Sequence, residues 1–169
     1  MDTLIADIAQ YGFIVSFVLA LVVWLRLPRR PQVELLVAGA IGAVVCLVLI
    51  KAAGAVFYDT RPFVAQHIAP LFPHAPDNGF PSDHTAVTML VGFCVFVVSR
   101  RWGSVLLALS LLAGAARVLA HVHSPVDIAA GVVIGAVAAA AGWLLARWIV
   151  GRWIAPRWPA LAPPMKPPA

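Results

Sequence analysis

The chain has 169 residues, of which 62% are hydrophobic and 11% are charged, and its formal net charge is +5. A soluble domain carries about 25% charged residues, so this chain has too little polar surface to cover itself in water. The mean hydropathy of +0.94 therefore favours an integral membrane protein. The positive charge does not indicate nucleic-acid binding, because the basic residues lie in short segments beside apolar stretches.

Five apolar stretches predict membrane-spanning helices, at residues 11–27, 33–57, 85–99, 103–120 and 126–150. A helix needs about 20 residues to cross the hydrocarbon core, so the third stretch is short unless its polar start lies in the interface. Residues 1–10 are predicted either to form a short interfacial segment or to extend the first span. We therefore expect an all-α, polytopic bundle of about five helices in a membrane domain of residues 1–150, followed by an Arg/Trp- and Pro-rich tail, residues 151–169.

The distribution of basic residues predicts the orientation of the bundle. They follow the first and third stretches and recur in the tail, as Arg26, Arg29, Arg30, Arg100, Arg101, Arg147, Arg152, Arg157 and Lys166. Five spans place all of these on one side, which the positive-inside rule assigns to the cytoplasm. The six tryptophans fall toward the same side and predict an interfacial belt.

Nearly all residues capable of chemistry fall on the opposite, outer side. They are Lys51, Arg61 and Arg117, four aspartates (Asp59, Asp77, Asp83, Asp127) and all five histidines (His67, His74, His84, His121, His123). A transporter would instead carry polar groups near the membrane midplane on interrupted helices. Cys46 and Cys94 lie in apolar runs and are expected to be buried, and no Cys/His spacing indicates zinc. We expect no metal and no cofactor.

Residues 117–127 predict a phosphate site at a helix N-terminus. Ser124, Pro125 and Asp127 suit the N-cap, first and third helical positions. Asp127 can then orient the ring of His123, leaving the other ring nitrogen free to attack as a nucleophile. Arg117, at the end of the preceding helix, is expected to bind the anion.

Residues 81–84 predict a second helix start with the same components. Ser82 is the expected N-cap, and free N–H groups at a helix start favour anions. Ser82 and Arg61 are expected to bind phosphate oxygens, and His84 to protonate a leaving oxygen. His67, His74 and His121 are expected to be ordinary loop or interface residues.

Three motifs carry a family resemblance: Arg61-Pro62, Pro81-Ser82-Asp83-His84, and Arg117 with its spacing to His123 and Asp127. Together they resemble the signature of the type 2 phosphatidic acid phosphatase superfamily, and more closely its bacitracin-resistance type of undecaprenyl-diphosphate phosphatase. The resemblance implies a metal-free reaction through a phosphohistidine on His123. It further implies that His84 acts as acid and then base, and that Arg61, Ser82 and Arg117 hold phosphate oxygens.

The chain departs from the superfamily pattern at three positions. Gly54 stands where the first motif has a lysine, and Lys51, one helical turn earlier, is expected to reach the phosphate instead. Asp83 replaces the usual glycine of the second motif, and Ala116 replaces a serine before Arg117. The substrate expected from the resemblance is undecaprenyl diphosphate at the outer face of a bacterial inner membrane. The alternatives are another lipid phosphate, such as phosphatidylglycerol phosphate or phosphatidic acid, and a non-catalytic lipid transporter or scramblase.

Overall fold

The computed structural model describes residues 1–158, and within them the chain is helical. The long helices are α1 (Asp2–Leu25), α2 (Arg29–Val56), α4 (Asp83–Val98), α5 (Arg100–Leu119) and α6 (Pro125–Ile149). A four-residue helix, α3 (Pro62–Ala65), interrupts the loop between α2 and α4. The rest of the predicted Pro-rich tail, including Lys166, lies outside the described residues. This architecture confirms the predicted all-α fold.

The predicted spans match the helices closely. α1, α2, α5 and the helical run from Pro125 to Arg157 are long and apolar enough to cross a membrane. α4 has only 16 residues, as its short apolar stretch predicted. α1 begins at Asp2, so residues 1–10 extend the first span and form no separate interfacial segment.

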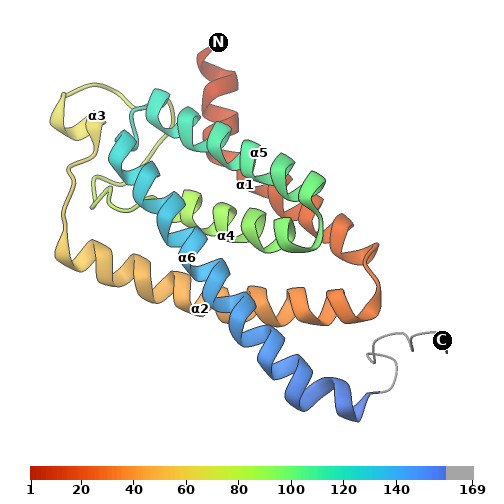
Figure 1. Cartoon of the computed structure of the whole chain (residues 1–169). Coiled ribbons are helices and arrows are strands. Elements are labelled where there is room, and N and C mark those ends of the chain that lie inside the picture. The colour runs from red at the N-terminus through yellow and green to blue at the C-terminus, as the bar shows by residue number, and fades with distance from the viewer. Residues whose placement is uncertain (159–169) are drawn as a thin grey trace.

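α4 lies at the centre of the bundle and packs against the other four long helices (Figure 1). The small residues of α6 allow the backbones of α2 and α4 to approach it closely. A Cβ on Gly135 would lie 2.6 Å from the carbonyl oxygen of Ala86 in α4. A Cβ on Gly142 would clash with the carbonyl oxygen of Ala38 in α2. These contacts hold α2 and α4 against α6 and fix where the N-termini of α4 and α6 meet.

The two ends of the bundle differ in chemistry. The N-terminal half of α1 packs at the end that carries α3 and the loop before α4 (Figure 1). There Ile5, Ile8, Phe63 and Leu71 pack against one small buried cluster that includes Val122. The arginines at the turn from α1 to α2 (Arg26, Arg29, Arg30) and at the start of α5 (Arg100, Arg101) lie at the other end. One tryptophan departs from the predicted belt: Trp143 is buried and donates a hydrogen bond to the carbonyl of Cys94 at 3.1 Å.

Candidate active site

The start of α6 is built around the carboxylate of Asp127. The Ser124 side chain accepts a hydrogen bond from the backbone N–H of Asp127 at 3.4 Å. In return, Asp127 Oδ2 accepts the backbone N–H of Ser124 at 2.8 Å, which completes a capping box. The predicted cap is confirmed, and it fixes the Asp127 side chain at a site where it is fully buried.

The same carboxylate oxygen holds the ring of His123. Asp127 Oδ2 lies 3.2 Å from His123 Nδ1, and Arg117 Nη2 lies 3.2 Å from His123 Nε2. A guanidinium nitrogen can only donate, so Nε2 must accept, and the ring proton belongs on Nδ1 facing Asp127. The lone pair of Nε2 therefore points toward Arg117, where an incoming anion would be bound.

The environment of His123 keeps its ring neutral. Burial lowers the pKa of His123 below its ordinary value, and the charges of Arg117 and Arg61 lower the pKa further. The hydrogen bond that His123 Nδ1 donates to Asp127 opposes this shift without cancelling it. A neutral imidazole with a fixed tautomer is the form required of a nitrogen nucleophile.

Arg117 is buried at the centre of the site. Its Nη1 donates to the carbonyl of Ala9 in α1 at 3.0 Å, and its Nη2 lies 3.2 Å from Nε2 of His74. Its Nε has no hydrogen-bond partner within residues 1–158. A buried cation with an unused donor beside a histidine lone pair is suited to an anionic oxygen.

A tight turn after α5 brings His123 back over Arg117. His121 adopts a left-handed conformation with φ of 63°, and the N–H groups of Val122 and His123 both bond to the carbonyl of Arg117. The carbonyl of His121 accepts the N–H of Phe63 from α3 at 3.0 Å. His121 is thus a residue of the turn, as predicted.

The start of α4 has the same components in a more open setting. Ser82 caps the helix, accepting the N–H of Thr85 at 3.4 Å, and its own N–H donates to the carbonyl of Asp127. Asp83 Oδ1 lies 3.1 Å from His84 Nδ1. The two side chains are 65% and 40% exposed, so water can reach this His–Asp pair.

Arg61 is buried and already engaged with protein groups. Its Nε donates to Asp77 at 2.8 Å, while its two terminal nitrogens donate to the carbonyls of Val122 and Asn78. Asp77 is 65% exposed, so it can give way to another anion. Burial tends to raise the pKa of Asp77, but the hydrogen bond and charge of Arg61 prevail and lower it.

Lys51 is exposed and lines a cavity of about 370 Å³ together with Arg61, Asp77 and Asp83. Gly54, where the superfamily has a lysine, packs against the loop before α4. A Cβ there would lie 3.1 Å from the carbonyl oxygen of Phe80. The position of Lys51 agrees with the interpretation that it replaces that lysine from one turn away.

Sequence reasoning missed several residues of the site. His74, predicted to be an ordinary loop residue, contacts Arg117, and its ring lies 6.3 Å from that of His123. Asp59 accepts the hydroxyl of Ser124 at 2.6 Å, and Asn78 ties the loop to Gly54 and Phe57. The only available signal was the concentration of polar residues in the loop between α2 and α4.

The residues that the structure describes hold no cluster of three or more His, Cys, Asp or Glu side chains suited to a metal ion. Cys46 and Cys94 are buried and unpaired with each other, as their apolar neighbours predicted. Three cationic side chains bring positive charge to this site: Arg117, Arg61 and, at its edge, Lys51.

Comparisons with known proteins agree with this geometry. Residues 33–151 match the PAP2 superfamily, the type 2 phosphatidic acid phosphatases. The chain belongs to this superfamily. It is 31% identical to the undecaprenyl-diphosphatase BcrC of Bacillus subtilis, over 81% of this chain and 70% of that protein. It is 29% identical to a protein of Bacillus licheniformis named bacitracin transport permease protein BcrC, over 82% of this chain and 68% of that one.

The fold also resembles a solved member of the same structural class. The crystal structure of LpxE from Aquifex aeolicus superposes with a TM-score of 0.64, covering 83% of this chain and 84% of that one at 22% identity. At this identity the likeness concerns the fold. The family assignment rests on the sequence match and confirms the resemblance drawn from the three motifs.

Proposed function

We propose that this protein hydrolyses undecaprenyl diphosphate to undecaprenyl phosphate and inorganic phosphate. The observation that carries the proposal is the geometry of the neutral His123. Its Nδ1 is held by Asp127, and its Nε2 faces the buried cation Arg117. The similarity to the undecaprenyl-diphosphatase of Bacillus subtilis supports this choice of substrate.

In the proposed reaction, Nε2 of His123 attacks the terminal phosphorus while the bond to the bridging oxygen breaks. His84 donates a proton to that oxygen, which leaves as the lipid phosphate. Water then attacks the phosphohistidine and gives a proton to His84, releasing inorganic phosphate and restoring both histidines. Arg117, Arg61 and Lys51 offset the negative charge of the phosphate oxygens. Ser82 caps the start of α4, where free backbone N–H groups favour an anion.

Two arginines must change hydrogen-bond partners when substrate binds. Arg117 would exchange its contact with His123 Nε2 for a phosphate oxygen, with its free Nε as a second donor. Arg61 would exchange the exposed Asp77 for another phosphate oxygen while keeping its bonds to the carbonyls of Val122 and Asn78. A diphosphate offers oxygens to both.

The test is phosphate release by the purified protein from undecaprenyl diphosphate, phosphatidic acid and phosphatidylglycerol phosphate. We expect the highest kcat/KM on the diphosphate, because it carries more charge to meet the cations and expels a better leaving group. Equal or faster hydrolysis of the glycerolipids would favour the alternative lipid phosphatase. Binding without hydrolysis of any of them would favour a transporter.

We further propose that the site faces the outside of a bacterial inner membrane and that the tail, residues 151–169, lies on the cytoplasmic surface. The arginines at the opposite end of the bundle support this orientation. A cysteine at Asn78 should react with an impermeant thiol reagent in intact cells, and one at Arg101 should not. The reverse pattern of labelling would contradict the proposed orientation.

A further inference from the structure

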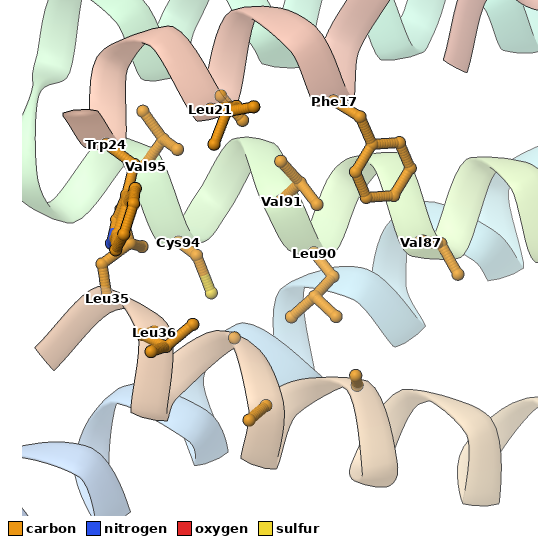
Figure 2. Close-up of a pocket in the computed structure, with 14 residues that line it drawn as sticks. Phe17, Leu21, Trp24, Leu35, Leu36, Val87, Leu90, Val91, Cys94 and Val95 are labelled. Atoms are coloured by element: carbon orange, nitrogen blue, oxygen red, sulfur yellow. The ribbon is translucent and has the colours of Figure 1, made fainter. Parts of the chain in front are cut away.

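A long apolar groove runs between α1 and α2, with α4 as its floor. Its volume is about 590 Å³. Figure 2 shows Phe17, Leu21 and Trp24 projecting into it from α1, above Val91 of α4 and Leu36 of α2. The groove exists because α1 packs on α4 and α5 while α2 packs on α4 and α6, so that α1 and α2 scarcely touch each other.

The groove adjoins the active site, because two residues line both the groove and a cavity next to His84. Phe17 and Val87, which line it, also line a second cavity of about 200 Å³ that reaches Asp83 and His84. Beyond this cavity, His84 shares a smaller space with Arg117. Apolar side chains therefore extend from the proposed acid, His84, along the groove between α1 and α2.

One wall of this groove lies outside the region that matches the superfamily. The match begins at residue 33, whereas the wall formed by α1 comes from residues 2–25. From Phe13, beside His84, to Trp24 the wall extends by eleven residues, or about 16 Å of helix. This is about half the thickness of the hydrocarbon core.

We propose that this groove binds the first part of the substrate's isoprenoid tail and so makes the enzyme prefer long-tailed diphosphates. The inference rests on the proposed function and adds a determinant of tail selectivity. Surrounding lipid is as apolar as the groove, so transfer from water is not the driving force. The gain comes from close packing along the tail, which positions the tethered diphosphate at Arg117.

Gly39 of α2 allows a direct test, because a Cβ at this position meets no atom within 4 Å. Gly39→Leu should fill part of the groove without displacing the backbone. Gly151→Leu is the matched control, since Gly151 also faces open space and does not line the groove. Gly39→Ala adds a single methyl group and should retain most of the activity.

The measurement is kcat/KM for undecaprenyl diphosphate and for geranyl diphosphate with the full-length variants in nanodiscs. Gly39→Leu should lower the value for undecaprenyl diphosphate about tenfold, mainly through KM, as expected when an apolar pocket loses room for a few methylene groups. Its value for geranyl diphosphate should stay within about twofold of the unmodified enzyme, because the shorter tail makes less contact. Gly151→Leu should change neither value.

Two results would overturn the assignment of the groove: unchanged hydrolysis of both substrates by Gly39→Leu, or an equal fall for both. The unmodified protein provides the separate test of the proposed function, because failure to hydrolyse undecaprenyl diphosphate would refute that function directly.

Discussion

Two helix starts meet in this active site, and they are assembled from the same three residue types. α4 begins with Ser82, Asp83 and His84, and α6 begins after His123 with Ser124 and reaches Asp127 in its first turn. In each, a serine caps the helix and an aspartate lies 3.1 to 3.2 Å from Nδ1 of a histidine. The two pairs nevertheless differ sharply in burial.

The pair at α6 has side chains 1% and 0% exposed, whereas the pair at α4 has side chains 40% and 65% exposed. A buried pair is held in one geometry and is kept from water, which suits a nucleophile. An exposed pair can exchange protons with water, which suits an acid that later acts as a base. The comparison indicates that burial, rather than residue type, assigns the two histidines their roles.

The largest expected effect is that of His123→Ala. Without the nucleophile, kcat should fall by about 10⁴-fold or more, and no phosphoenzyme should form. Rapid quenching with ³²P-labelled substrate measures the intermediate. His84→Ala is the contrasting variant. It should slow the formation and the hydrolysis of the phosphoenzyme, but the phosphoenzyme should still form. Full activity of His123→Ala would exclude the proposed mechanism.

The two aspartates should differ in importance as their histidines differ in burial. Asp127→Asn keeps an oxygen for the capping box but loses the charge that orients His123, so kcat should fall by about 10²- to 10³-fold. Asp83→Asn acts on an exposed contact and should lower kcat by about threefold. Steady-state kinetics on both variants measures the difference, and equal losses would contradict the division of roles.

The pH dependence of kcat/KM should report the neutral state of His123. Because burial and nearby arginines lower its pKa, the fall of activity at acid pH should lie at lower pH than for an ordinary histidine. Asp127 raises this pKa, so Asp127→Asn should move the acid limb to lower pH while reducing the rate. If the acid limb of the pH profile moved to higher pH in Asp127→Asn, the Asp127 carboxylate would not be acting on His123.

A smaller effect is expected from His74, the half-buried loop residue that accepts a hydrogen bond from Arg117. His74→Ala removes one acceptor of this guanidinium and should lower kcat/KM by about fivefold, the value of one ordinary hydrogen bond. His67→Asn is the control, because His67 is exposed and asparagine tolerates its positive φ of 54°. Equal activity of both variants would remove His74 from the site.

The smallest expected effect is that of chelation. Arginine and lysine side chains supply the positive charge at this site, so excess EDTA should leave phosphate release unchanged. Loss of activity in EDTA that added Mg²⁺ restores would show that the phosphate also needs a metal.

The sequence by itself determined the five long helices, the starts of α4 and α6, and the end of the bundle at which the polar residues gather. Apolar length predicts a span because a membrane requires every backbone group to be bonded within its own helix. Ser82 and Ser124 predict helix starts because capping involves residues only three positions apart. The motif spacing around His123 was equally local, which is why its contact with Asp127 could be predicted.

Only the tertiary structure decided how these local pieces are used. Arg117 contacts Ala9, 108 residues away, and His74, 43 residues away, and no pattern in the sequence relates such positions. The engagement of Arg61 by Asp77 and the groove between α1 and α2 likewise depend on how separate helices pack. Burial of Asp127 and exposure of Asp83 follow from the same packing, because a residue's access to water depends on its neighbours in space.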